Sequence, residues 1–528
     1  MRIYNIFILN IIFMFYSCNT SSENVDISLN DFKFLEIDII TLHNGYKNRD
    51  FTIEEVTRAY IKRIEKIDQN GPKLNSIIEI NPEAIKIAKL LDNEIKINGL
   101  RGYLHGVPIL LKDNINTKDQ MSTTAGSRAL NGSKPLEDSK VVEKLRKAGA
   151  LILGKANLSE WANFRGRRST SGWSGINGQT KNPYVLTRNP CGSSSGSGVS
   201  VSANLTLLAI GTETNGSIVC PSSVNGVVGI KPTVGLISRS GIIPISYTQD
   251  TAGPMARSVQ DAAICLGFLT GIDENDKKTI KSLNKTYEDY TQFLNKNGLK
   301  DKRIGVYTGP LGLNDKVDSL FKKSVESIKK MGAEIIEIET ISSSEVRSHS
   351  FQVMIHEYKD GLNNYFKSLG KNSPIKNLGE LIKFNENDSI ELKYFNQAYL
   401  KMALNTEGIK SEKYLNSLSS LKTLSQKEGI DKVMDENDLD LIIAPSGSPS
   451  WSTDWFNGDN YHISSSSPSA WAGYPIISVP MGNIHGLPVG ISFFGRAWSE
   501  PTLIEASYAF EQSVQARIIP NFYTDDEY

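Results

Sequence analysis

The chain has 528 residues, of which 39% are hydrophobic and 42 are glycines, and its 58 basic side chains balance 58 acidic ones. This composition is that of a folded enzyme rich in turns and excludes a disordered or fibrous protein, while the length allows one large α/β domain or two smaller domains. Because the formal charge is zero and no basic stripe or acidic tail stands out, nucleic acid is not an expected partner.

The N-terminus has the pattern of a targeting segment. Residues 1–18 contain one basic side chain, Arg2, followed by an apolar run over 6–15 that is too short to span a membrane comfortably, and they end at Cys18. The pattern resembles a bacterial lipoprotein signal, which implies lipidation of Cys18; an uncleaved anchor and an ordinary cleaved signal are the alternatives. Either way we expect the body outside the cytoplasm, in the cell envelope or periplasm, behind a polar tether over 19–25.

Helix and strand patterns alternate through the first part of the body. Thr52 and Glu55 form a capping box ahead of apolar residues at helical spacing, which predicts a helix over 53–68. The predicted elements that follow are a strand at 74–80, a helix at 83–97 ended by Gly99, a strand at 107–111 that delivers Lys112 to a rim, a helix capped by Asp138 and ending near Gly149, and a strand at 150–154. This alternation is typical of an α/β protein.

The remaining segments differ in character. Residues 166–200 are rich in Gly, Ser and Asn and lack periodicity, which predicts a long functional loop. Residues 275–435 are richer in Lys, Glu and Asn and mostly helical in pattern, which predicts a peripheral helical layer or lid. The other predicted elements are strands at 205–210, 227–230, 439–444, 476–480 and 489–494, and helices at 259–269 and 501–515. Strands at both ends of the body are expected to share one sheet, so we predict a single domain over 26–528.

The other cysteines give no sign of a metal site. Cys191, Cys220 and Cys265 form no CxxC pair and have no nearby histidine, so neither a zinc site nor a dense disulfide framework is indicated. We predict that all three are structural thiols.

A serine hydrolase needs a base for its hydroxyl, either a histidine or an unprotonated lysine. None of the six histidines lies in a Ser- or Gly-rich loop. Residues 192–196 fit the G-x-S-x-G pattern of a nucleophile elbow, but no clear strand precedes them. Lys112 ends an apolar strand, where burial would lower the pKa of its ammonium group and keep it neutral; a solvated lysine at a strand end is the alternative.

Three motifs place Lys112 in a recognisable setting. Residues 106–114 read Gly-Val-Pro-Ile-Leu-Leu-Lys-Asp-Asn, residues 190–197 read Pro-Cys-Gly-Ser-Ser-Ser-Gly-Ser, and residues 211–221 read Gly-Thr-Glu-Thr-Asn-Gly-Ser-Ile-Val-Cys-Pro. In order and spacing they resemble the amidase signature family, and the resemblance continues through residues 226–233, 250–255 and 486–490. It implies a single large α/β domain with a mixed, twisted β-sheet core covered by helices, and a reaction that requires no metal or organic cofactor.

The resemblance also implies roles for individual residues. Ser217 becomes the nucleophile, Ser193 the bridging serine after a cis Gly192–Ser193 peptide bond, and Lys112 the terminal base. The oxyanion formed during attack on an amide needs preorganised N–H donors, and the loop before the nucleophile can aim several at one point. The candidate donors are Thr214, Asn215 and Gly216, together with Ser217 itself.

The nucleophile loop departs from the commoner family pattern at three positions. Glu213 replaces the usual Asp, Asn215 stands where Gly is usual, and Val219 stands where Arg is usual. This variant resembles the peptide amidase branch, which acts on C-terminal carboxamides of peptides. Six aromatic residues in loops near the motifs are candidates to line an acyl or peptide cleft, with simple packing as the alternative: Trp161, Trp173, Tyr247, Trp451, Trp455 and Trp471.

Two other functions compete with an exported amidase. The glutamine-hydrolysing component of the amidotransferase that amidates misacylated tRNA has the same relay, but it works in the cytosol with partner proteins, and an export signal contradicts it. A non-catalytic surface binding lipoprotein on the same scaffold would be expected to lack a relay residue, whereas all three are present.

Overall fold

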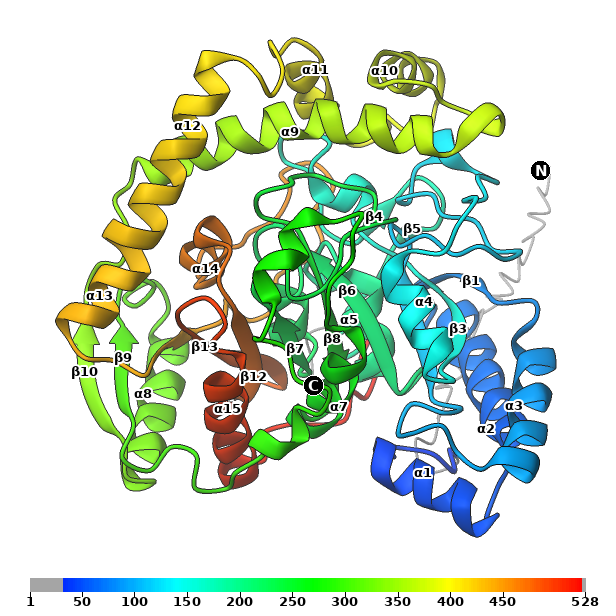
Figure 1. Ribbon diagram of the computed structural model, residues 1–528, viewed down its shortest axis with the longest axis horizontal. Helices are drawn as coiled ribbons and strands as arrows, with labels where there is room; N and C mark the ends of the chain where they lie inside the picture. Colours follow the sequence, from blue (N-terminus) through cyan, green and yellow to red (C-terminus); the bar gives the residue numbers. More distant parts are fainter. Residues whose placement is uncertain (1–31, 525–528) are drawn as a thin grey trace, which may run out of the picture.

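The computed structural model describes residues 32–524. The predicted signal segment 1–18 with Cys18, and the tether over 19–25, lie outside the described residues. Within them an 11-stranded mixed sheet runs through the molecule in the order β1-β3-β2-β6-β8-β7-β12-β13-β11-β9-β10 (Figure 1). Its strands are β1 (Ile77–Ile80), β2 (Pro108–Lys112), β3 (Leu151–Ala156), β6 (Leu208–Glu213), β7 (Val228–Lys231), β8 (Thr251–Ala256), β9 (Arg303–Tyr307), β10 (Glu334–Ile338), β11 (Leu441–Pro445), β12 (Ile476–Ile484) and β13 (Leu487–Phe494). The strands from both ends of the body thus share one sheet, as predicted, in a single α/β domain.

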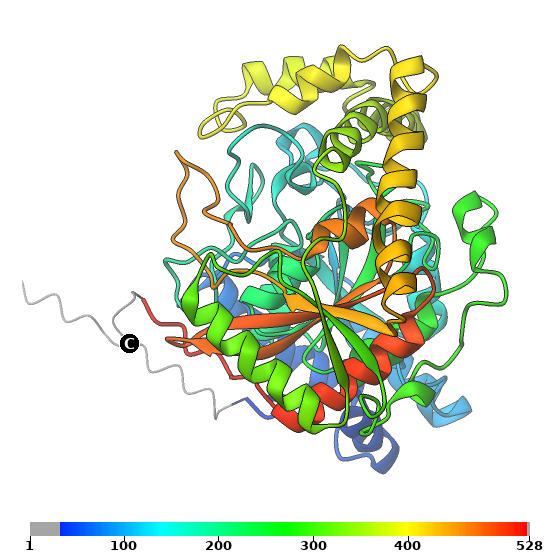
Figure 2. The same cartoon turned by 90° about the vertical axis from the view of Figure 1, so that its left-hand side faces the viewer.

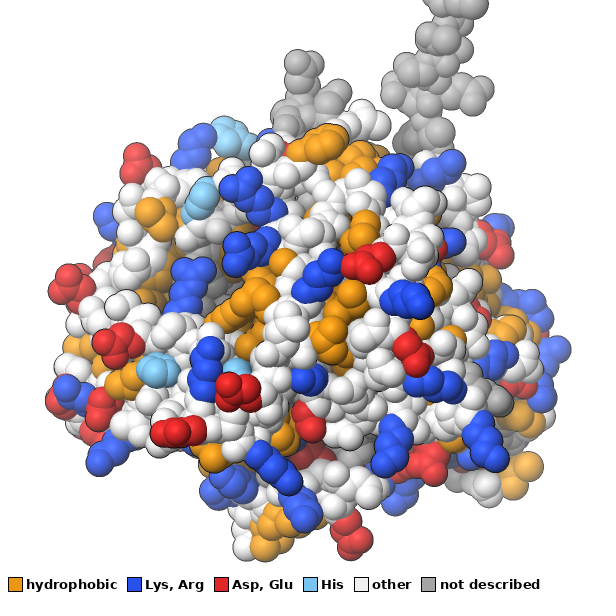
Figure 3. Space-filling view, turned by 90° about the horizontal axis from the view of Figure 1, so that it is seen from above, with side chains coloured by type: hydrophobic (Ala, Val, Ile, Leu, Met, Phe, Trp, Pro, Cys, Tyr) orange, Lys and Arg blue, Asp and Glu red, His pale blue; other side chains and the backbone are white. Residues whose placement is uncertain are grey.

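Helices cover this sheet. They are α1 (Ile39–Asn48), α2 (Ile53–Arg63), α3 (Ala84–Asn98), α4 (Lys140–Lys147), α5 (Ser195–Ser202), α6 (Val219–Val224), α7 (Val259–Leu269), α8 (Asp315–Lys330), α9 (Val346–Ser368), α10 (Leu378–Asn387), α11 (Ala398–Leu404), α12 (Glu412–Lys422), α13 (Asp431–Glu436), α14 (Ser466–Ala472) and α15 (Glu500–Val514). Figures 1 and 2 show α9 to α13 arching over one end of the sheet, with α12 and α13 running down its flank. Basic and acidic side chains are interspersed on the face seen from above (Figure 3).

The centre of the sheet brings residues of several motifs to one edge. Strand β2 pairs in parallel with β3 and β6, and every residue of these three strands is buried, as is usual for parallel strands covered on both faces. Lys112 and Glu213 are the last residues of β2 and β6. Because parallel strands end at the same edge, both side chains reach it together. The antiparallel β8 begins there, with Thr251 opposite Glu213.

Many of the predicted elements are confirmed. The capping box between Thr52 and Glu55 is present in both directions, and α2 continues through a π-helical turn at Ile64–Gln69, so the helix spans the predicted range. Gly99 ends α3 at a φ of 75°, and α7 coincides with the predicted helix 259–269.

One prediction was wrong and two were incomplete. Ser139, not Asp138, caps α4, because the Asp138 carboxylate accepts from Lys118 N and pairs with Arg146 instead. The predicted loop 166–200 contains the short hairpin strands β4 (Trp173–Ser174) and β5 (Gly178–Gln179) and ends in helix α5. The region 275–435 is not only a helical layer, because it also supplies strand β9 and the edge strand β10. Within residues 32–524 no helix is long and apolar enough to cross a membrane.

A buried ion cluster fastens the helical region to the body. The Arg165 guanidinium reaches Glu160 Oε2 at 2.9 Å and Glu391 Oε2 at 3.4 Å, and all three side chains are buried. Glu391 follows α10 and also accepts from Arg128 N at 2.7 Å. Burial raises the pKa of Glu160 well above its usual range. Two carboxylates from distant segments therefore depend on one guanidinium.

Replacing Arg165 by leucine should destabilise the protein strongly, because Glu160 and Glu391 would stay buried without the guanidinium that both bind. Removing one partner of a buried ion pair costs about 3–5 kcal/mol, which urea unfolding followed by circular dichroism would measure. The matched control is Arg128→Gln, which removes a more exposed pair with Asp388 of the same segment and should cost at most about 1 kcal/mol. Equal losses in the two variants would contradict the fastening role of the cluster.

Candidate active site

Lys112 is fully buried at the end of β2, and its amine makes three polar contacts. Nζ lies 2.7 Å from Ser193 Oγ, 3.0 Å from the carbonyl oxygen of Thr212 and 2.9 Å from Thr212 Oγ1. Burial lowers the pKa of Lys112 to about 7, although the nearby carboxylates of Asp250 and Glu213 act in the opposite direction. A substantial fraction of the amine is therefore neutral near pH 7 and can accept a proton from Ser193.

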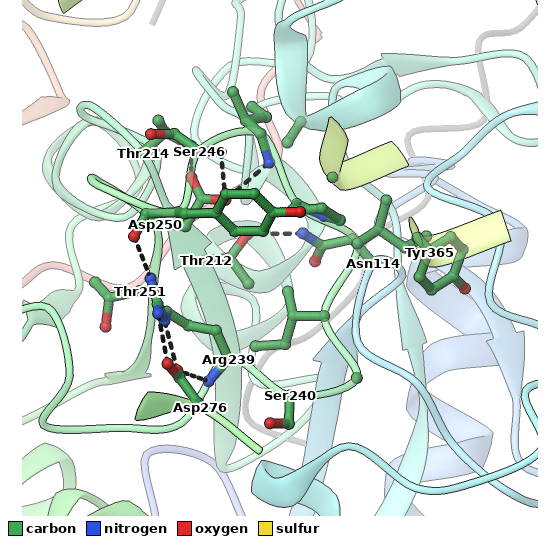
Figure 4. Close-up of a pocket in the computed structure, with 18 of the residues that line it drawn as sticks. Asn114, Thr212, Thr214, Arg239, Ser240, Ser246, Asp250, Thr251, Asp276 and Tyr365 are labelled. Carbon is green, nitrogen blue, oxygen red and sulfur yellow. Dashed lines mark hydrogen bonds and ion pairs between the residues drawn. The ribbon is translucent and has the colours of Figure 1, made fainter. Parts of the chain in front are cut away.

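Thr212, which binds the Lys112 amine, also lines a small chamber of about 250 Å³ (Figure 4). Asn114 Nδ2 donates to Thr212 Oγ1 at 3.0 Å, so this hydroxyl is held between Asn114 and Lys112. Asp250 also lines the chamber and accepts from Thr214 Oγ1 at 2.6 Å. Thr212, held by Asn114, orients the lysine amine. Sequence reasoning missed both residues, although they lie inside the quoted motifs.

Ser193 stands where two tightly packed segments meet. The Gly192–Ser193 peptide bond is cis, as the family resemblance implies. Gly192 has no room for a side chain, because a Cβ there would collide with Ser159 Oγ. Ser194 N donates to Ser217 O at 3.1 Å, which joins the segment of the bridging serine directly to that of the predicted nucleophile.

Ser217 lies in a turn that the Glu213 side chain organises. The two carboxylate oxygens accept from the N–H groups of Gly216 at 2.8 Å, Ile218 at 2.7 Å and Val219 at 3.0 Å. Gly216 has a φ of 82°, a conformation that favours glycine. The turn presents Ser217 to the cleft, with 8% of its surface exposed.

The predicted oxyanion donors are not equivalent. Within residues 32–524, the N–H groups of Thr214, Asn215 and Ser217 donate to no other protein group, so they remain free for a substrate oxygen. The Gly216 N–H already donates to Glu213, so it is not free for an oxyanion. Gly216 contributes to the turn through its backbone conformation instead. No hydrogen bond joins the hydroxyls of Ser193 and Ser217 in this part of the chain either.

A cleft of about 920 Å³ opens over Ser217. Of the six aromatic candidates, Trp451 and Trp471 line it. The others lie elsewhere: Tyr247 lines the small chamber, Trp161 and Trp173 pack in the interior, and Trp455 is exposed and donates to Gln179. The apolar side chains Phe351 and Met354 of α9 complete the cleft and were missed by sequence reasoning, because only the fold brings α9 to the site.

The prediction of three structural thiols was wrong for two of them. Cys191 and Cys220 form a disulfide with their Cα atoms 6.0 Å apart, and both line the cleft. Cys265 is a buried free thiol, as predicted. Within residues 32–524, no group of three or more His, Cys, Asp or Glu side chains could hold a metal ion.

Comparison with known proteins shows what this chain is similar to. A family model described as Amidase matches residues 55–504. The solved structure of native peptide amidase from Stenotrophomonas maltophilia is 45% identical, with a TM-score of 0.90 and coverage of 93% of this chain and 100% of that one. A probable amidase of Arabidopsis thaliana is 41% identical over 502 residues, 93% of this chain and 92% of the relative. A glutamyl-tRNA(Gln) amidotransferase component of Thermoanaerobacter pseudethanolicus is 33% identical over 511 residues, 91% of this chain and 97% of that protein.

The fold is that of a single α/β domain, and the matches to amidases over nearly the whole chain show an enzyme that hydrolyses amides. More narrowly, the chain belongs to the amidase signature family.

Replacing Lys112 by methionine should leave the fold intact, because a buried amine is exchanged for an apolar chain of similar length. Proton transfer by a positioned side chain contributes about 100- to 10,000-fold, so kcat should fall by at least about 100-fold. In the parent protein kcat should rise with pH through about 7, because only the neutral amine accepts a proton. Lys62→Met, at an exposed position of α2, is the control, and a Lys112→Met variant that keeps this ascending limb would refute the assignment.

Replacing Glu213 by glutamine should have two separate effects, one on the turn that carries Ser217 and one on the pKa of Lys112. The loss of charge-assisted hydrogen bonds to the turn should lower kcat about tenfold or more. Because the Glu213 carboxylate raises the pKa of Lys112, its removal should also shift the ascending limb of the pH profile to lower pH. Glu500→Gln removes a buried carboxylate that binds Thr233 N away from the cleft, and it should shift neither quantity. A shift toward higher pH in the Glu213 variant would be the wrong sign for this account.

Proposed function

We propose that this protein hydrolyses primary carboxamides at the C-terminus of peptides through a relay of Lys112, Ser193 and Ser217. The observation that carries the proposal is the contact of 2.7 Å between the buried Lys112 amine and Ser193 Oγ, because a lysine whose pKa lies near 7 can act as a base. The hydrogen bond from Ser194 N to Ser217 O, which joins the segments of the two serines, supports the proposal.

The relay accounts for both halves of the reaction. The Ser217 hydroxyl turns toward Ser193 as its oxygen attacks the amide carbonyl, while Ser193 takes its proton and passes its own to Lys112. The oxyanion is stabilised by the free N–H groups of the loop, with Thr214 and Asn215 as the proposed donors. When the C–N bond breaks, the proton returns through Ser193 to the departing ammonia. Water then hydrolyses the acyl-serine ester through the same relay and releases the carboxylic acid.

Two features support a peptide amide as the substrate. The similarity to a peptide amidase extends over nearly the whole chain, at 45% identity. The cleft has a volume of about 920 Å³ and is lined by the apolar side chains of Trp451, Trp471 and Phe351 as well as by Ser217. A cleft of this kind suits the acyl part of a substrate whose leaving group is only ammonia.

We also propose export and anchoring through a lipid on Cys18. The pattern of residues 1–18 supports this proposal, and so does the disulfide between Cys191 and Cys220, because disulfides persist mainly in oxidising compartments. Labelling with a radioactive fatty acid in the parent protein but not in Cys18→Ala would test the anchor.

The amidotransferase function is the second candidate, because a relative with that name is 33% identical over 91% of this chain. It predicts ammonia transfer from glutamine only in a complex with partner proteins. The non-catalytic alternative predicts no reaction of Ser217 with electrophiles.

A panel of amides separates these functions. Purified protein should release ammonia from peptide amides faster than from free glutamine, amino acid amides, fatty amides or arylamides, without any partner. A serine-directed fluorophosphonate should label the parent protein, and Ser217→Ala should lose the label. The matched control is Ser222→Ala in the following helix, whose hydroxyl lies outside the cleft and should leave the labelling unchanged. Glutamine as the single productive substrate would favour the amidotransferase function, and an unlabelled parent protein would favour the non-catalytic one.

A further inference from the structure

The disulfide joins the two segments that carry the serines of the relay. Cys191 lies two residues before Ser193, and Cys220 lies three residues after Ser217. Both half-cystines line the same cleft as Ser217 and pack beside Trp451. The covalent bond therefore spans the reacting pair rather than a distant part of the fold.

Hydrogen bonds supplement this covalent tie. Ser194 N donates to Ser217 O at 3.1 Å. Asn225 Nδ2 lies 2.9 Å from Pro190 O and 2.7 Å from Pro221 O, so one amide bridges the same two segments. Without the disulfide, these weaker contacts would have to hold Ser193 against Ser217.

The backbone at Cys191 depends on its surroundings. Its φ of 55° lies in the left-handed region, which residues with a Cβ rarely adopt, and such a conformation persists only where neighbouring groups impose it. Cys191 N donates to Asn189 Oδ1 at 2.8 Å, and Ser195 Oγ donates to Cys191 O at 2.6 Å. The disulfide fixes the side chain of the same residue. Freeing that side chain removes one of the constraints two residues from Ser193.

We propose that the Cys191–Cys220 disulfide is a redox-sensitive positioning element, which aligns Ser193 with Ser217 and lowers hydrolysis when a small thiol reduces it. This inference rests on the proposed relay. In the reduction, two molecules of a low-molecular-weight thiol give two electrons and two protons to the protein. The protein S–S bond breaks, both cysteines become thiols, and one S–S bond forms in the reagent. Cys191 is 5% exposed and Cys220 2% exposed, and both line the cleft, so a small thiol must approach the disulfide from the cleft.

The position of the disulfide predicts which kinetic constant changes on reduction. Two of the three contacts of the Lys112 amine are to Thr212 on β6, and burial is the main cause of its lowered pKa, so the ascending limb of the pH profile should persist in the reduced protein even if the contact to Ser193 lengthens. Misplacing a catalytic group by about 1 Å can cost about 100-fold in rate, so we expect kcat to fall at least about tenfold on reduction. KM should change less than kcat, because Trp471, Phe351 and Met354, which also line the cleft, lie outside the linked segments.

The experiment compares the oxidised protein with protein treated with dithiothreitol, with the cysteine state confirmed by mass spectrometry after alkylation. Ammonia release from a peptide amide gives kcat and KM, and the rate of fluorophosphonate labelling of Ser217 gives a readout independent of the substrate. Reoxidation should restore both rates. Cys191→Ser and the double variant Cys191→Ala, Cys220→Ala should have low rates that dithiothreitol does not alter. Cys265→Ala, at the buried free thiol of α7, should respond to the reagent as the parent protein does.

Equal kcat and equal labelling rates in protein with an intact and a broken disulfide would overturn the proposal. Loss of activity accompanied by loss of the folded circular dichroism spectrum would also overturn it, because the disulfide would then stabilise the whole fold rather than position the two serines. If the oxidised protein neither releases ammonia nor reacts with the fluorophosphonate, the proposed relay itself fails. If only the labelling rate responds reversibly to reduction, the inference stands and the peptide amide was the wrong substrate.

Discussion

The active site depends on one physical constraint, the burial of a lysine amine at the end of a parallel strand. Removing an ammonium ion from water costs free energy, so burial favours the neutral amine and lowers the pKa of Lys112 to about 7. The sheet provides this environment, because β3 and β6 flank β2 and neighbouring elements cover both faces. Thr212 then supplies two oxygens as hydrogen-bond partners, so the amine is desolvated but not isolated. Asp250 and Glu213 limit how far the pKa falls.

The same edge of the sheet also organises the nucleophile. Glu213 follows Thr212 directly, and its carboxylate gathers three N–H groups of the turn that presents Ser217. One strand thus orients the base through its penultimate residue and the nucleophile through its last one. The helical region is fixed independently, because the buried cluster around Arg165 ties the segment after α10 to the body while α9 lines the cleft.

How much could be read from the sequence depends on the kind of signal each element carries. The helix at 259–269 and the strand ending at Lys112 have clear patterns and were predicted. Strand β8 was missed because it contains Gly253 and Pro254, which are poor strand residues; a Cβ at Gly253 would collide with Ile230 O of the neighbouring strand, so the close approach of β7 requires glycine. Helix α5 is built of Ser, Gly and Val and is buried on every side, so it shows no amphipathic period.

The site divides in a similar way. Lys112, Ser193 and Ser217 sit in motifs whose order along the chain can be recognised, whereas the contribution of Phe351 arises only when α9 folds over the sheet. The pairing of Cys191 with Cys220 likewise cannot be deduced from spacing, because any two of the cysteines could pair on that evidence alone.

The strand order has a consequence for how the molecule is made. The central strand β7 takes β12 as one of its neighbours, and β12 follows roughly half a chain length later. Such a pairing closes a very long loop, so the sheet stays incomplete until almost the entire chain has been synthesised. A chain that stopped before β12 would leave β7 with an open edge, a template for pairing with other chains. Strands β12 and β13 therefore complete the interior of the sheet. Strand β12 also covers the edge of β7, through which a newly made chain could otherwise aggregate.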